Sequence, residues 1–138
     1  MAAIVEFEDE NGRVVRYVRH ANGGGLVSPR ARVHAGASVA PTAYIEAGAQ
    51  VGDRSRIGSG SWVDHDASVG QDVVVAGNVR LGPRSRADDG SWIGTGARVG
   101  SDAVIGRGAR VLPDAVVPDG AVVRRRAGSG RSEFATAA

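Results

Sequence analysis

Between residues 27 and 123 an aliphatic side chain recurs at every sixth position. Sixteen of the seventeen positions in this series are Val, Ile or Leu, and Ala87 is the exception. A strict period of six is far longer than one turn of an amphipathic helix and persists for far longer than an isolated strand. The pattern therefore indicates a repeated structural unit in which each hexapeptide turns one aliphatic side chain inward.

Two further positions of the hexapeptide are restricted in the same way. The residue four places after each aliphatic is Ala or Ser in fourteen of sixteen cases, with Val73 and Val79 as exceptions. The residue three places after is Gly, Asp or Asn in twelve of sixteen cases. These residue types adopt a positive φ most easily, so each unit predicts a straight side followed by a sharp corner.

This repeat resembles the hexapeptide repeat of the left-handed parallel β-helix superfamily, which includes acyltransferases and γ-class carbonic anhydrases. The resemblance implies three hexapeptides per coil, so that residues 18 apart in the chain are stacked. We therefore predict an all-β protein built on a single-stranded left-handed parallel β-helix of a little over five coils, covering residues 27–123. Val69, Leu81 and Ile93 should be fully buried in it, and the short side chain of Ala87 should leave a local gap.

The two ends of the chain differ from the repeat. Residues 1–26 are predicted to form an N-terminal cap and link, because two short hydrophobic runs flank Asn11-Gly12, a strong hairpin signal. Residues 124–138 are rich in Arg and are predicted to form a tail without regular structure. The charges of Arg124–Arg126 would protect the open edge of the last coil, or could contact an acidic protein partner.

Composition narrows the function classes. The formal net charge is +2 with no Cys, and the four Arg and one Glu of residues 124–138 leave the remaining chain at −1. This balance gives no specific nucleic-acid signal. No apolar run approaches about 18 residues and no signal-peptide pattern is present, so we expect a cytoplasmic protein with no membrane partner. Incorporation into a virion or another assembly stays compatible with the sequence.

The candidates for catalysis are the three histidines. Acyltransferases of the superfamily typically use a His as general base in a cleft between subunits, with acyl-CoA as co-substrate. His65 is the best candidate here, with Asp64 or Asp66 to orient it. The alternative is structural: Asp66 occupies a corner and Asp64 is simply solvated. His20 precedes the repeat and His34 points outward from a flat face, so neither is assigned a role.

No metal site and no resident cofactor are predicted. The γ-class carbonic anhydrases bind zinc through three His, two of them five residues apart, and this chain has no such pair. His34 and His65 are separated by 31 residues, which is not a multiple of the 18-residue coil. They are therefore not expected to share a column.

Exposed aromatic residues are a further candidate site. Tyr44, Trp62 and Trp92 each precede an inward aliphatic and must point outward. One outward column on a single face would contain Leu26, Tyr44, Trp62, Arg80 and Arg98. Trp92 would lie on a different face above Val74, beside a smooth row of Ala40, Gly58, Ala76 and Gly94. Members of the superfamily usually form trimers through such faces; a ligand site or a contact with a further protein partner is the alternative.

Two functions from different classes remain. The sequence favours a non-catalytic homotrimeric scaffold or binding module, which could belong to a larger structural assembly. It does so because the repeat carries no extruded loop, no C-terminal helix follows it, and only His65 is a candidate base. The alternative is an acyl-CoA-dependent acyltransferase with His65 as general base at a subunit interface.

Overall fold

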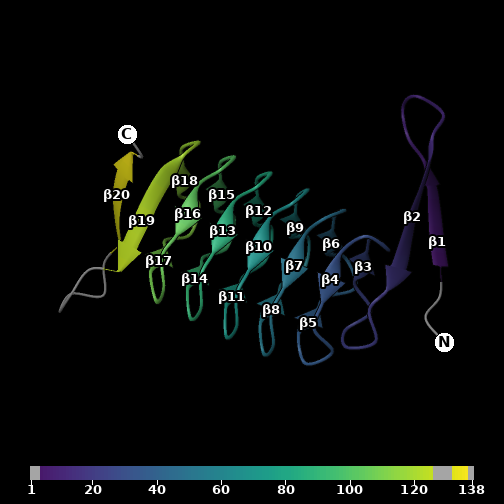
Figure 1. Ribbon diagram of the computed structural model, residues 1–138, viewed down its shortest axis with the longest axis horizontal. Coiled ribbons are helices and arrows are strands. Elements are labelled where there is room, and N and C mark those ends of the chain that lie inside the picture. The colour runs from purple at the N-terminus through teal and green to yellow at the C-terminus, as the bar shows by residue number, and fades with distance from the viewer. Residues whose placement is uncertain (1–3, 126–131, 137–138) are drawn as a thin grey trace.

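The computed structural model describes residues 4–125 and 132–136. These residues form a left-handed, all-β solenoid of about five turns with an antiparallel hairpin at its N-terminal end, as the sequence predicted. The described residues contain no helix. The coils are stacked along one axis, with the two chain ends at opposite ends of the solenoid (Figure 1).

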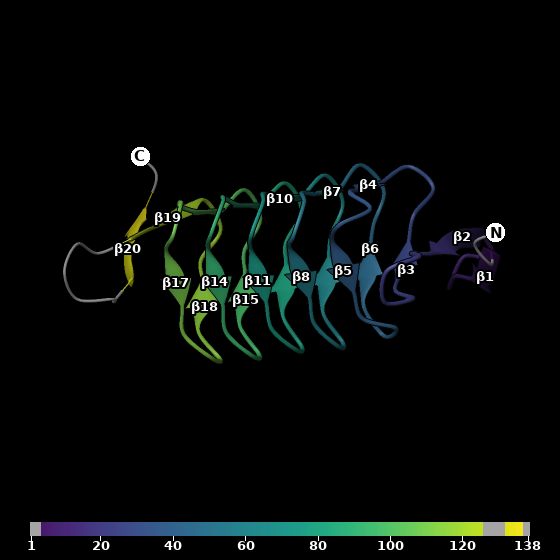
Figure 2. The ribbon, with the colours of Figure 1, turned by 90° about the horizontal axis from the view of Figure 1, so that it is seen from below.

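Three sheets form the sides of the prism (Figure 2). Sheet A contains, in spatial order, β1 (Ile4–Glu8), β2 (Val14–Arg19), β3 (Leu26–Val27), β6 (Tyr44–Ile45), β9 (Trp62–Val63), β12 (Arg80–Leu81), β15 (Arg98–Val99) and β18 (Val116–Val117). Sheet B contains β4 (Arg32–Val33), β7 (Gln50–Val51), β10 (Ser68–Val69), β13 (Arg86–Ala87), β16 (Val104–Ile105), β19 (Ala121–Arg125) and β20 (Ser132–Thr136). Sheet C contains β5 (Ser38–Val39), β8 (Arg56–Ile57), β11 (Val74–Val75), β14 (Trp92–Ile93) and β17 (Arg110–Val111).

The parallel strands pair with a register of 18 residues throughout the repeat. In sheet B, for example, Val51 lies opposite Val69, which in turn lies opposite Ala87. The inward aliphatics form one continuous core, and Val69, Leu81 and Ile93 are at most 2% exposed, as predicted. Burial of this apolar surface is the main source of stability, at roughly 1.5–3 kcal/mol for each large aliphatic side chain before entropy is subtracted.

The corners have the left-handed backbone that the sequence indicated. A positive φ recurs at every sixth residue from Gly48 to Gly120, and glycine is replaced there by Asp, Asn or Arg at seven positions. Arg54 and Arg84 were not anticipated at corners. Each lies one coil before a corner aspartate and binds it through two hydrogen bonds, Arg54 to Asp72 at 2.9 and 3.1 Å and Arg84 to Asp102 at the same distances. These forked ion pairs accompany the strained arginine backbone.

The two valines at the small inward position have a specific solution. In the ordinary turn the N–H of the small residue bonds to the carbonyl three residues earlier, as in Ala67 N–H to Asp64 O. Val73 N–H instead donates to Ser55 Oγ at 3.0 Å, and that hydroxyl donates to Gly70 O at 2.6 Å. Ser61 serves Val79 in the same way. A serine one coil earlier thus bridges a turn that the bulkier valine opens.

Both ends carry antiparallel strands. At the N-terminus β1 and β2 form the expected hairpin, with Gly12 at a φ of 74°, and β2 pairs antiparallel with β3 of the first coil. At the C-terminus β20 pairs antiparallel with β19 over residues 121–125 and 132–136. The expectation of a tail without regular structure from residue 124 is therefore wrong for Arg124, Arg125 and residues 132–136. Arg126 and the other tail residues lie outside the described part of the chain.

Candidate functional site

An aromatic ladder runs along the outer face of sheet A. We define it as Phe7, Tyr17, Tyr44 and Trp62, which contact one another in that order. The ring centroids are 5.8, 5.4 and 5.3 Å apart; the first two pairs meet edge to face and Tyr44 stacks on Trp62 at 29°. Such offset and T-shaped arrangements suit the charge distribution of aromatic rings. Trp62, at 45% exposure, ends the ladder in solvent.

The sequence anticipated the upper half of this ladder and not the lower half. Tyr44 and Trp62 stack as the 18-residue spacing requires. Leu26 was expected to continue the exposed column, but it is only 5% exposed, because sheet A continues at this point into the hairpin strand β2. The hairpin supplies Tyr17 and Phe7 to the same surface. Their antiparallel strands do not follow the six-residue phase, so the repeat could not have placed them.

Tyr17 also anchors the hairpin to the second coil. Its hydroxyl donates to both carboxylate oxygens of Glu46, at 2.8 and 3.1 Å, and both residues are buried. Burial and the bond to Glu46 raise the pKa of Tyr17, which keeps the phenol protonated and able to donate. The signal for this pair was available in the sequence. Glu46 directly follows the inward Ile45, a position that holds small residues in most of the repeat.

Asp64 and His65 form a hydrogen-bonded pair at the corner that joins sheet A to sheet B. Asp64 Oδ1 accepts from the backbone N–H of His65 at 2.7 Å and lies 2.8 Å from the ring Nδ1. Asp64 Oδ2 accepts from Arg80 at 3.0 Å. The Asp64 side chain is 10% exposed, whereas the imidazole is 61% exposed. Burial acts to raise the pKa of Asp64, but the bonds from His65 and Arg80 outweigh it and hold that pKa below its usual range.

The partners of His65 determine which of its nitrogens carries the proton. A carboxylate can only accept, so the nitrogen facing Asp64, Nδ1, is the protonated one. In the neutral ring Nε2 then has a lone pair, and the ring itself is largely in solvent. This is the arrangement of a general base whose orientation is fixed by a second residue.

The other histidines differ in this respect. His34 Nδ1 accepts from the backbone N–H of Gly36 at 3.0 Å, so a neutral His34 carries its proton on Nε2 and offers no lone pair to a substrate. Asp53 Oδ1 lies 3.2 Å from the same Nδ1, a pairing the sequence reasoning missed because the two residues are 19 apart. His20 Nε2 lies 2.8 Å from Ala37 O and ties the link to the first coil.

Asp66, the second candidate to orient His65, has a different position. It is a corner residue with a φ of 60°, and its backbone N–H bonds to Ala47 O. Its Oδ1 lies over Gly48 of the preceding coil, where a Cβ would collide with it. Among the described residues the hydrogen bonds of the His65 ring involve Asp64 and not Asp66. Of the two alternatives considered for the catalytic pair, the structure brings together His65 and Asp64.

The remaining arginine and tryptophan candidates lie where the repeat places them. Arg80 and Arg98 occupy sheet A beyond Trp62, and Arg98 is exposed. Trp92 lies on sheet C between Val74 and Arg110, and the Arg110 guanidinium sits 5.9 Å from the centre of its ring. Arg110 was not singled out from the sequence, although its 18-residue distance from Trp92 predicts this contact.

Two searches of the described residues concern metals and membranes. No group of three or more His, Asp or Glu side chains in the described ranges is placed to hold a metal ion. Within the same ranges, nothing folds into a helix with the length and apolar character needed to cross a bilayer.

Comparison with known proteins identifies the fold. No protein-family model and no curated protein sequence matches the chain. Among solved structures, a mutant of perosamine N-acetyltransferase from Caulobacter crescentus, in complex with CoA and GDP-perosamine, aligns with 22% identity and a TM-score of 0.54 over 80% of this chain. The acetyltransferase domain of PglB from Neisseria gonorrhoeae, in complex with acetyl coenzyme A, aligns with 22% identity and a TM-score of 0.54 over 78% of this chain. The chain has the hexapeptide-repeat β-helix fold of acetyltransferases.

The match covers the solenoid and leaves much of each neighbour unmatched. It spans 53% of the perosamine enzyme and 56% of the PglB domain, so the chain corresponds to about half the length of either. At 22% identity the likeness concerns the fold, and the chemistry must be argued from the side chains of this chain.

Proposed function

We propose that this protein transfers an acyl group from an acyl-CoA to a hydroxyl or amine acceptor, with His65 as the general base. The observation that carries the proposal is the exposed Nε2 of His65, held in the base-competent tautomer by the buried carboxylate of Asp64. The sequence favoured a scaffold because Asp64 could have been merely solvated. The burial of Asp64 and its bonds to His65 and Arg80 shift the balance. The acetyltransferase fold supports the same reaction class.

Each group has a defined role in this reaction. His65 Nε2 removes the proton of the acceptor as its oxygen or nitrogen attacks the thioester carbonyl carbon. The tetrahedral intermediate then collapses, the carbon–sulfur bond breaks, and the leaving thiolate takes the proton from the imidazolium. Asp64 stabilises the imidazolium while it exists. Arg80, at 3.0 Å, keeps the Asp64 carboxylate ionised and oriented.

The position of His65 favours a site shared between subunits. The corner of Asp64 and His65 directly follows β9, whose outward residue is Trp62 at the end of the aromatic ladder. A second prism packed on the outer face of sheet A would cover the ladder and leave this corner at the rim of the contact. We therefore propose a homotrimer in which the acceptor and the acyl-CoA enter between neighbouring prisms beside His65.

The test is release of free thiol from acetyl-CoA in the presence of a panel of amino-sugar and hydroxyl acceptors. We expect His65→Ala to lower kcat/KM by about 10²–10⁴-fold. Asp64→Asn should lower it less and alter the pH profile, because the amide no longer stabilises the imidazolium. His34→Ala is the matched control, since it removes an exposed imidazole of the other tautomer, and it should leave the rate unchanged. Turnover that survives His65→Ala would contradict the proposal.

A second candidate function is a non-catalytic homotrimeric scaffold or binding module, and the aromatic ladder favours it. Phe7 and Trp62 are 43% and 45% exposed at its two ends, an uncommon arrangement for a surface without a partner. A protein that assembles through this ladder but releases no thiol from acetyl-CoA with any acceptor in the panel would support the scaffold instead.

A further inference from the structure

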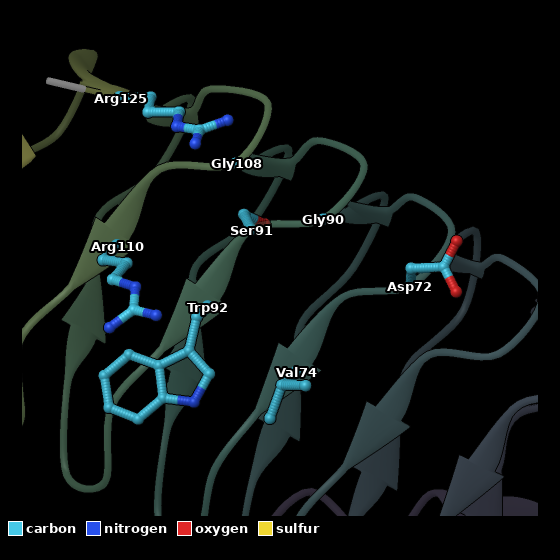
Figure 3. Close-up of a pocket in the computed structure, with 8 residues that line it drawn as sticks. All are labelled: Asp72, Val74, Gly90, Ser91, Trp92, Gly108, Arg110 and Arg125. Carbon is cyan, nitrogen blue, oxygen red and sulfur yellow. The ribbon is translucent and has the colours of Figure 1, made fainter. Parts of the chain in front are cut away.

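A hollow opens on the outer face of sheet C near the last coils (Figure 3). Its volume is about 520 Å³. Trp92 and Arg110 line it from neighbouring strands, Arg125 lines it from β19, and the corner glycines Gly90 and Gly108 form part of its wall. It lies on a different side of the prism from His65, which belongs to the corner between sheets A and B. Nothing argued above for acyl transfer uses it.

The 18-residue spacing builds this hollow from two parallel columns. Val74, Trp92 and Arg110 are the outward residues of β11, β14 and β17, which pair in that order. The corner column beside them contains Gly90 and Gly108, both with positive φ. A Cβ at Gly108 would come within 3.1 Å of Arg125 Cδ, so the absence of a side chain there lets Arg125 lie across the corner. The glycines therefore give the hollow its depth as well as its turn.

The lining combines an aromatic ring with positive charge. The Arg110 guanidinium lies 5.9 Å from the centre of the Trp92 ring, and the two side chains point toward one another in Figure 3. Asp72 lies at the far side of the hollow, but its carboxylate is held by both nitrogens of the Arg54 fork at 2.9 and 3.1 Å. The charge of Asp72 is thus compensated within the fold. Arg110 and Arg125 leave the lining positive.

We propose that this hollow binds a nucleoside diphosphate. The flat base would stack on Trp92, with Val74 extending the apolar surface beneath it, and the phosphates would receive charge-assisted hydrogen bonds from Arg110 and Arg125. Guanidinium groups match phosphate oxygens in pairs, and an indole ring stacks on any base. The ligand is either a free nucleotide or the nucleotide end of a larger coenzyme, since both present the same ring and diphosphate.

Trp92 itself provides the readout. The chain has two tryptophans, so Trp62→Phe leaves Trp92 as the only indole. Titration of this variant with ADP should quench its fluorescence to saturation. Adenosine and inorganic pyrophosphate should each bind at least about tenfold more weakly than ADP, because each offers only one of the two contacts.

Substitutions then assign the contacts, measured by calorimetry with ADP. Arg110→Gln and Arg125→Gln should each weaken binding by about tenfold or more, the effect of losing one charge-assisted hydrogen bond. Trp92→Ala should abolish saturable binding and Trp92→Phe should retain it, since phenylalanine keeps a ring. Arg98→Gln is the matched control, an exposed outward arginine on sheet A, and should change nothing. Circular dichroism and urea melts check that each variant keeps the solenoid.

The outcomes separate this site from acyl transfer and from general charge attraction. Absence of saturation at millimolar ADP overturns the proposal, as does an equal loss in Arg98→Gln and Arg110→Gln. Competition with acetyl-CoA identifies the source: displacement of ADP assigns the hollow to the nucleotide end of a coenzyme, and its persistence assigns it to a free nucleotide. Because binding is measured without turnover, a failure of His65 to act as a base would leave this result intact.

Discussion

The interior of this solenoid and its outer surface follow different periods. Along β7, β10, β13 and β16 the inward side chains are all aliphatic or Ala and all buried. The outward neighbours on the same four strands are Gln50, Ser68, Arg86 and Val104. The interior repeats its chemistry every six residues, whereas the surface repeats only its geometry and changes its chemistry from coil to coil. Stability and function are thus encoded at different positions of the same hexapeptide.

The largest expected effect is that of a charge placed in the interior. Val69→Asp puts a carboxylate between Val51 and Ala87, and without a partner it should lower the free energy of unfolding by several kcal/mol. Ser68→Asp, on the outward side of the same strand, should change it by less than about 0.5 kcal/mol. Urea melts of the two variants measure the difference. Equal losses would mean that the two sides of the strand are not distinct in the way described.

The next effect concerns the two outer faces that carry tryptophan. If the ladder on sheet A is the contact between subunits, Trp62→Glu should yield monomers, because a carboxylate would be buried in an apolar interface. Trp92→Glu on sheet C should stay trimeric. Light scattering at micromolar concentration distinguishes these cases. The reverse result would move the interface to sheet C, and a monomeric parent protein would remove the basis for assembly through either face.

These contrasts show which parts of the molecule the sequence could predict. The buried ladders and the corners depend only on residue type at a fixed spacing, so Val69, Leu81 and Ile93 were placed correctly. Leu26 was misplaced because an antiparallel hairpin, which has no hexapeptide phase, covers the first coil. The pairing of His34 with Asp53 was missed because corner residues meet neighbours at 19 residues as well as at 18. Long-range contacts of irregular segments are set by tertiary packing, and no local pattern records them.

A smaller effect separates a buried surface charge from an exposed one. Asp64→Asn should lower the free energy of unfolding at neutral pH by about 1–2 kcal/mol, because it removes a charged acceptor from His65 and Arg80. The pKa of Asp64 is lowered by folding, so its contribution is complete above the unfolded pKa and is lost as the pH falls through the folded value. The difference between parent and variant should therefore shrink below about pH 4.

Asp72→Asn is the control for this measurement. The pKa of Asp72 is also lowered, by its hydrogen bond from Arg54, but the pair is exposed and solvent screens it. Its substitution should have a smaller effect across the same pH range. A difference between parent and Asp64→Asn that does not vary with pH would show that the charge of Asp64 contributes nothing to folding.

The smallest expected effect tests the one irregular position of the interior. Ala87 is buried between Val69 and Ile105, and its short side chain should leave unfilled space. Ala87→Val should raise the free energy of unfolding by a few tenths to about 1 kcal/mol, measured in urea. A loss of stability instead would mean that neighbouring side chains already fill the space.

The mismatch between a six-residue interior and an 18-residue exterior has a consequence for how such a chain can change. Deleting one hexapeptide keeps every later aliphatic side chain inward, yet moves every later outward residue to the next side of the prism. Removing two hexapeptides between Trp62 and Trp92 would bring Trp92 to the position of Arg80, directly paired with Trp62. Short in-frame deletions could therefore rearrange the binding surface of this protein without designing a new core.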